Sequence, residues 1–226
     1  MHCLGLLENQ SEVYYLSYYF HMKQNDIQVS LTEFVNFINA SGMSKVTIVS
    51  AAKAKHEEQE GNPYDYWKDF KDEIKKLLKR GGNKDDLWEL VEDVRDEMRE
   101  NYNQMIAGFI KFWKPSRMEW VNPVRKMAHI GGVKVILNPE LGIKWQGKEY
   151  MIKLFLKANE NLDKRHADII LAMMESELRD KVNKNTEFAI LDVRRGKLFT
   201  YVNDDSRLLI LLRSEGREFA DMWKDI

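Results

Sequence analysis

Residues 143–157 read IKWQGKEYMIKLFLK, and this stretch decides the class of fold. Residues 143–145 and 150–157 are rich in apolar side chains, and they flank Gln146-Gly147-Lys148. Short apolar segments on either side of a glycine-containing loop predict a β-hairpin. The C-terminal half of the chain is therefore expected to contain a sheet.

Further strands are predicted on both sides of this hairpin. Residues 133–137 alternate apolar with polar or smaller side chains after the Gly131-Gly132 turn. A second hairpin is predicted for residues 187–193 and 197–201 across Arg194-Arg195-Gly196. Between the two hairpins, Asp163 is expected to cap a helix, because an aspartate oxygen can accept the free N–H groups of a first helical turn.

Before Pro115 the apolar residues recur at helical spacing instead. Ser30, followed three residues later by Glu33, forms a capping-box signature for the first helix. Four more helices are predicted between Ser44 and Pro115, and a last one from about residue 205. The fold class is therefore α+β, with a helical N-terminal half and a C-terminal mixed or antiparallel sheet with flanking helices.

The chain is expected to divide into a leader at 1–29, a helical region at 30–114 and an α+β domain at 115–226. The leader is predicted to be disordered or to stem from a non-native upstream start, because four tyrosines lie at positions 14, 15, 18 and 19 with no cap or turn signal. Met22 offers an alternative start. An amphipathic helix packed on the body is the other interpretation.

The amino-acid composition indicates a folded protein that does not span a membrane. Hydrophobic residues make up 44% and charged residues 31% of the 226 residues, a balance typical of a folded domain. The net charge of −1 provides no global attraction to nucleic acid or anionic membranes. The single cysteine, Cys3, permits no intramolecular disulfide and no cysteine zinc site, and no segment approaches the roughly 20 apolar residues of a membrane span. A cytoplasmic protein without a membrane partner is expected.

The charge is divided unevenly along the chain. Residues 1–114 hold 15 basic and 19 acidic side chains, whereas residues 115–226 hold 20 and 17. The strand-rich half is thus the electropositive one, which favours local contact with phosphates. Ordinary solvated surfaces are the alternative interpretation.

The sequence contains no phosphate-loop, nucleophile-elbow or zinc-protease motif. Polar residues that could take part in catalysis or binding are concentrated between Asn138 and Lys197. Lys153 and Lys157 stand four apart in a predicted strand, so their side chains leave from the same face. Two amines in a dry core would be prohibitively costly. That face is therefore expected either to meet solvent or to line a polar site.

Residues 138–199 resemble a set of bacterial proteins of unknown function that carry the elements N-P-E-L-G, K-L-x-x-K, K-x-x-A-D and L-D-V-R-R-G-K-L-F. The order of predicted elements from about residue 96 to 193 is also similar to the restriction-endonuclease-like core. In such nucleases an acidic residue after a proline and a (D/E)-x-K motif on the next strand position divalent metals and activate water. The matching positions are Pro139-Glu140 and Met151-Ile152-Lys153.

The resemblance implies a degenerate site, because Met151 stands where the second carboxylate belongs. A thioether cannot replace a carboxylate oxygen as a ligand for magnesium. The ligand set for a divalent metal is incomplete unless Asp168 or Asp192 completes it, so no residue is predicted as a metal ligand and the cofactor stays open. The predicted catalytic residues are Glu140, Lys153, Asp168 and Asp192. The predicted nucleic-acid-binding residues are Lys157, Lys164, Arg165, Arg194, Arg195 and Lys197.

Structural roles are the alternative for the three carboxylates: Glu140 closing a turn, Asp168 pairing with Lys164, and Asp192 bonding within its own hairpin turn. Three functions follow from these interpretations. The first is a nucleic-acid-binding module with a degenerate nuclease-like core. The second is a scaffold that presents Tyr64, Trp67, Trp88 and Trp113 to a protein partner, with a place in the hydrophobic core as the alternative for these rings. The third is a small-molecule enzyme that uses Glu140 or Asp168 as general base.

Overall fold

The computed structural model describes residues 27–57, 65–113, 117–157, 162–201 and 206–226. Two mixed sheets of five and three strands are surrounded by helices, so the predicted α+β class is confirmed. Within the described residues, no helix has both the length and the apolar character that crossing a bilayer requires.

The N-terminal half is mostly helical, as predicted. In chain order it contains β1 (Gln28–Ser30), α2 (Leu31–Asn39), α3 (Met43–Glu57), α4 (Lys68–Arg80), the 3-10 helix η1 (Lys84–Glu89), α5 (Leu90–Asp93) and α6 (Asp96–Phe112). The capping box predicted for α2 is confirmed: the Glu33 backbone N–H donates to Ser30 Oγ at 3.2 Å, and the Ser30 N–H donates to Glu33 Oε2 at 2.8 Å.

The C-terminal half holds most of the strands. They are β2 (Met118–Val121), β3 (Lys126–Ile130), β4 (Val133–Leu137), β5 (Leu141–Trp145), β6 (Lys148–Phe155), β7 (Glu187–Asp192) and β8 (Lys197–Thr200), with the helices α7 (Lys164–Leu178), η2 (Arg179–Lys181) and α8 (Ser206–Asp225). The predicted hairpins and the Asp163 cap are confirmed, since Asp163 Oδ1 accepts the His166 N–H at 2.8 Å.

The five-stranded sheet has the order β2-β5-β6-β7-β8. Strands β2, β5 and β6 are antiparallel neighbours, β6 and β7 are parallel, and β8 returns antiparallel to β7. Because β6 and β7 run in the same direction, helix α7 must cross over between them. The C-terminal ends of β6 and β7 therefore lie at the same end of the sheet, next to the β7–β8 turn.

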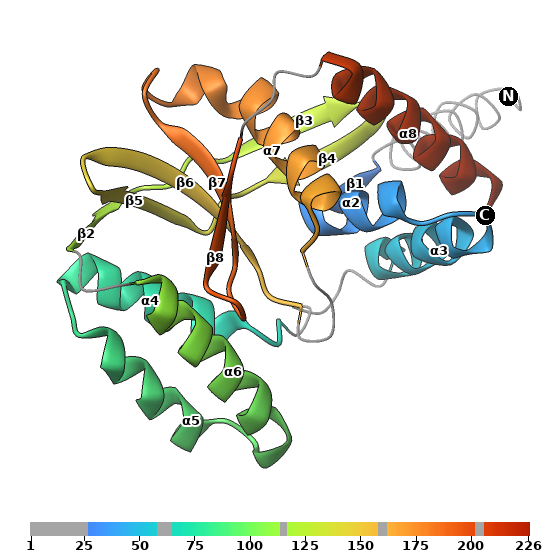
Figure 1. Ribbon diagram of the computed structural model, residues 1–226. Helices are drawn as coiled ribbons and strands as arrows, with labels where there is room; N and C mark the ends of the chain where they lie inside the picture. The colour runs from blue at the N-terminus through green and yellow to red at the C-terminus, as the bar shows by residue number, and fades with distance from the viewer. Residues whose placement is uncertain (1–26, 58–64, 114–116, 158–161, 202–205) are drawn as a thin grey trace, which may run out of the picture.

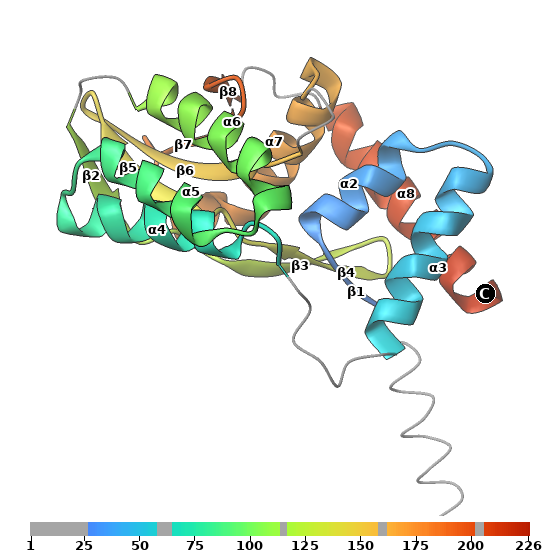
Figure 2. The ribbon, with the colours of Figure 1, turned by 90° about the horizontal axis from the view of Figure 1, so that it is seen from below.

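Helices cover both faces of this sheet. On one face, α4 and α6 pack against β2, β5 and the residues of β6 and β7 that point toward them, such as Ile152 and Leu191. On the other face, α7 and α2 pack against Met151, Phe188 and Ile190, in a cluster that also includes the three-stranded sheet and α8. Figures 1 and 2 show the helices α4–α6 together on one side, with α2, α3, α7 and α8 on the other.

Three short strands, β1, β2 and β3, were not anticipated from the sequence. Strand β1 pairs in parallel with β4, which attaches the N-terminal part of the described chain to the C-terminal half. Residues 27–29 of the predicted leader thus belong to the folded structure, with Ile27 and Val29 buried, whereas residues 1–26 lie outside the described residues. Both hydrophobic clusters combine residues from the predicted regions 30–114 and 115–226.

The aromatic residues considered for contact with a protein partner differ in their exposure. Trp113 is buried against Phe109, and Trp67 is stacked on Tyr102 with ring centroids 5.2 Å apart. Trp88 is 41% exposed, and Tyr64 lies outside the described residues. Trp113 is therefore a core residue, as the alternative predicted, whereas Trp67 is partly buried where it packs in the α4–α6 layer.

Candidate functional site

Glu140 and Lys153 form an ion pair inside the protein. Glu140 directly precedes β5, and the pairing of Leu141 with Ile152 brings it beside Lys153 on β6. The Lys153 Nζ donates to Glu140 Oε1, and the Leu154 backbone N–H donates to Glu140 Oε2 at 2.8 Å. The two side chains are only 11% and 12% exposed. Glu140 is thus held by an ammonium and a backbone N–H rather than closing a turn.

A small pocket lies beside this pair, between α2, β6 and the first turn of α7. Its polar lining comes from Thr32, Asn36, Lys153, Lys157 and His166, and its volume of about 20 Å³ suits a single water molecule. Lys153 and Lys157 both line it, so they leave the backbone on the same side as predicted. The Lys157 Nζ donates to Asn36 Oδ1 at 3.0 Å.

Asp192 ends strand β7 and has a local hydrogen-bonding role. It is 2% exposed and accepts the Arg195 N–H at 3.3 Å and the Arg195 guanidinium Nη1 at 3.1 Å. A buried carboxylate of this kind stabilises the turn that follows the strand. Asp192 lies opposite Phe155 in the sheet. The alternative in which Asp192 bonds within its own hairpin turn matches these contacts.

Asp168 lies on the outer side of α7. Its carboxylate accepts a hydrogen bond from Lys164 Nζ at 2.6 Å, four residues earlier in the same helix. Such exposed pairs contribute about 0.3–0.5 kcal/mol. The structure thus brings Glu140 together with Lys153, whereas the interactions of Asp168 and Asp192 are with the neighbouring cations Lys164 and Arg195.

The residues around Glu140 do not fit a divalent metal. Met151 is buried in the core at the position that the nuclease motif assigns to a carboxylate, and both Glu140 oxygens already accept hydrogen bonds. Among the residues that the structure describes, no three His, Cys, Asp or Glu side chains are grouped closely enough to hold a metal ion. Magnesium requires several oxygen ligands in octahedral geometry. Glu140 therefore cannot supply the ligand set of a magnesium site.

Cations gather at the end of the sheet where β6 and β7 finish. The Val193 N–H donates to the Phe155 carbonyl at 3.2 Å, which holds the β7–β8 turn against the end of β6. His166 in the first turn of α7 lines the same pocket as Lys157. We call this surface the basic end and define it by the following residues: Lys157, Lys164, Arg165, Arg194, Arg195 and Lys197.

Most side chains of the basic end are open to solvent. The Arg165 side chain is exposed and has no hydrogen-bond or ion-pair partner within the described part of the chain, where only its backbone N–H bonds to Asp163. Lys197 is also exposed, with its Nζ 4.5 Å from the centre of the Phe199 ring. Two carboxylates lower the net positive charge here: the exposed Asp163, which caps α7, and the partly exposed Asp168 in its second turn. The His166 backbone N–H, with a further bond from its imidazole, holds the pKa of Asp163 below its usual value. Asp163 therefore stays ionised as the helix cap.

Helix α6 supports the basic end through a glycine contact. A Cβ on Gly108 would lie 2.0 Å from the Val193 carbonyl oxygen, and Gly196, at φ +61°, approaches the Gly108 carbonyl. Only residues without a Cβ allow this close approach of the two backbones. The β7–β8 turn is therefore held in a fixed position, with its arginines directed away from the core.

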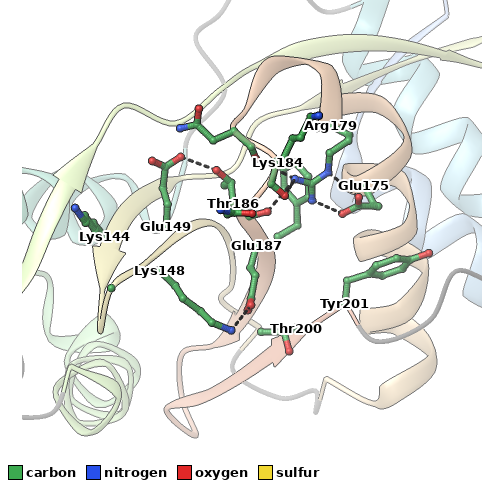
Figure 3. Close-up of a pocket in the computed structure, with 14 residues that line it drawn as sticks. Lys144, Lys148, Glu149, Glu175, Arg179, Lys184, Thr186, Glu187, Thr200 and Tyr201 are labelled. Atoms are coloured by element: carbon green, nitrogen blue, oxygen red, sulfur yellow. Dashed lines mark hydrogen bonds and ion pairs between the residues drawn. The ribbon is translucent and has the colours of Figure 1, made fainter.

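A larger hollow lies at the opposite ends of β6 and β7, where these strands begin (Figure 3). Its lining comes from the β5–β6 hairpin, the end of α7, the residues leading into β7 and the end of β8. Sequence reasoning did not find it, because its residues come from four separate segments. The charged residues at positions 144, 148, 149, 184 and 187 are the signal that could have indicated it.

Comparison with known proteins provides no relative: no family model, no curated protein and no solved structure matches this chain.

Proposed function

We propose that this protein binds nucleic acid through the basic end and that its nuclease-like core does not hydrolyse it. The observation that carries this proposal is the meeting of cations from three segments at one end of a sheet. Lys157 follows β6, Lys164 and Arg165 begin α7, and the β7–β8 turn contributes the rest. Cations held by separate, well-packed elements can contact several phosphates of one strand at once.

The order of elements supports a relation to the restriction-endonuclease-like core. Helix α6, strand β2, the β5–β6 hairpin, α7 and β7 follow one another in the order that this resemblance implies, with the β3–β4 hairpin inserted after β2. The acidic residue after a proline and the lysine of the next strand also meet, as Glu140 and Lys153. These features favour descent from a nucleic-acid enzyme.

The chemistry of the pair favours binding without cleavage. Hydrolysis in such nucleases needs metal-bound oxygen ligands and an activated water. Here Lys153 is neutralised by Glu140, and Met151 offers no ligand oxygen. The pair therefore serves as a buried polar contact that fixes β5 against β6 beneath the basic end.

Fluorescence anisotropy with labelled 20-nucleotide single strands and duplexes tests the binding, at a low salt concentration of about 50 mM. The variant R165A/R194A/K197A removes three cations of the basic end while keeping Arg195, whose loss would leave Asp192 buried without its partner. We expect its affinity to fall at least about tenfold.

The matched control is R213A/R217A/K224A, which removes three exposed cations from α8. It changes the net charge by the same amount, and we expect its affinity to stay near that of the wild type. Absence of binding by the wild-type protein, or an equal loss in both variants, would contradict the proposal. Incubation of the same strands with Mg²⁺ or Mn²⁺ tests the second part, and cleavage that the variant E140Q abolishes would overturn it.

A further inference from the structure

The hollow where β6 and β7 begin, shown in Figure 3, is separate from the basic end and has a volume of about 1190 Å³. It lies on the α7 side of the sheet, and Phe188 forms part of its floor. A space of this size accommodates a small organic ligand. The polar groups that line it therefore decide what could bind.

One wall is fixed by Arg179 at the C-terminal end of α7. The guanidinium donates from Nε and Nη2 to the two carboxylate oxygens of Glu175, each at 2.7 Å. It also donates from Nη1 to the carbonyls of Thr186 at 2.9 Å and Asn183 at 3.2 Å, and it lies over the Phe188 ring. Arg179 thus holds the segment leading into β7 in place, and its charge is neutralised by Glu175.

A second ion pair bridges the starts of the two parallel strands. The Lys148 Nζ donates to Glu187 Oε1 at 2.5 Å, and this hydrogen bond raises the pKa of Lys148 above its usual value. The Lys148 ammonium and the Glu187 carboxylate thus neutralise each other. Neither Arg179 nor Lys148 is therefore available to neutralise an incoming anion.

Two exposed lysines remain, one on each side of the hollow. Lys144 is the penultimate residue of β5, and Lys184 belongs to the segment between α7 and β7. Neither side-chain ammonium has a hydrogen-bond or ion-pair partner in the described portions of the chain, although the Lys184 carbonyl accepts a hydrogen bond from Arg179 Nη1 at 3.5 Å. Two ammonium groups without a counter-ion at the edges of one space favour an anionic group with several acceptor oxygens.

The Glu149 carboxylate, a hydrogen-bond acceptor, also lines the hollow. The Thr186 hydroxyl donates to Glu149 Oε1 at 2.8 Å, and Figure 3 shows these side chains turned toward each other. The second Glu149 oxygen has no partner among the residues described. A carboxylate oxygen in this state accepts hydrogen bonds from ligand hydroxyl groups.

We propose that this hollow binds a phosphorylated polyol, with Lys144 and Lys184 on the phosphate and Glu149 on the hydroxyl groups. This site goes beyond the proposed nucleic-acid binding and shares no residue with the basic end. Isothermal titration calorimetry of the full chain with ribose 5-phosphate, inorganic phosphate and ribose tests it. We expect ribose 5-phosphate to bind more tightly than either fragment.

Single substitutions distinguish recognition of the phosphate group from recognition of the hydroxyl groups. K144A and K184A should each weaken the binding of ribose 5-phosphate about tenfold. E149Q keeps an oxygen for Thr186 but weakens the acceptor, so it should reduce the affinity for ribose 5-phosphate several-fold and leave the affinity for inorganic phosphate unreduced. Substitution of these partly or fully exposed side chains should leave the folded structure intact.

Two controls keep the interpretation specific. K75A removes a lysine from α4, and R165A/R194A/K197A removes cations from the basic end; both should bind ribose 5-phosphate like the wild type. If no binding is detected up to about 10 mM ribose 5-phosphate, the affinity is too weak for a specific ligand site, and the proposal is overturned. Unchanged affinity in both K144A and K184A would overturn it as well. Neither result bears on nucleic-acid binding at the basic end.

Discussion

Replacing Lys153 with methionine is expected to destabilise the protein strongly. The substitution keeps most of the apolar stem and removes the ammonium, which leaves the Glu140 carboxylate in the interior with only the Leu154 N–H as a donor. Breaking a buried ion pair in this way typically costs about 3–5 kcal/mol. Because both side chains are about nine-tenths buried, solvent can compensate only a small part of this cost.

Substitutions of Glu140, alone and together with Lys153, test whether the loss of stability comes from an unpaired buried charge. E140Q removes the negative charge but keeps an amide oxygen that can accept the Leu154 N–H, and it leaves the Lys153 ammonium without its counter-ion. The double variant E140Q/K153M contains no charge at this position and keeps the backbone hydrogen bond. We expect it to be more stable than K153M by about 2 kcal/mol, because no uncompensated charge is left buried.

Equilibrium unfolding in guanidinium chloride, followed by tryptophan fluorescence at pH 7, gives the free energy of unfolding of the wild type, K153M, E140Q and the double variant. The double-mutant cycle gives the coupling free energy between the two side chains. A cost below about 1 kcal/mol for K153M would refute the buried pair. Costs of E140Q and K153M that simply add in the double variant would refute it too.

Three further substitutions test the local structure. Gly108→Ala places a Cβ 2.0 Å from the Val193 carbonyl, so it should lower the stability by about 1–3 kcal/mol or more and lower the melting temperature; a melting temperature equal to that of the wild type would mean that the contact is not formed. Ser30→Ala removes the helix cap of α2 and should cost about 1 kcal/mol in denaturant unfolding, while Ser30→Thr should restore most of it. Asp163→Ala should cost a similar amount at pH 7. Because the His166 N–H lowers the folded-state pKa of Asp163, its contribution is present above the unfolded-state pKa and is lost as the pH falls through the lower folded-state value, so the cost should shrink at pH 3 and not at pH 9.

The strongly patterned parts of the fold could be predicted from the sequence. The hairpin around Gln146-Gly147 and the helix after Asp163 each carry a local signal, a left-handed turn in one case and a side-chain cap in the other. Strands β1 and β2 lack such a signal. In particular, Ser30 is both the last residue of β1 and the cap of α2, so its capping role conceals the strand that precedes it.

The candidate site was predictable only in part. The same-face placement of Lys153 and Lys157 follows from strand periodicity, and the meeting of Lys153 with Glu140 follows from the hairpin that joins their strands. The pairing of Asp168 with Lys164 follows from their spacing of four residues on one helix. The hollow depends on the parallel pairing of β6 with β7, a contact between residues more than thirty positions apart in the chain.

The dependence of nucleic-acid affinity on salt concentration tests the central claim most directly. Four to six phosphate contacts at the basic end predict that the logarithm of the association constant falls with the logarithm of the salt concentration with a slope of about −3 to −5. In R165A/R194A/K197A the slope should become shallower by about 2–3. A wild-type slope near zero, or the same slope in this variant, would contradict the account.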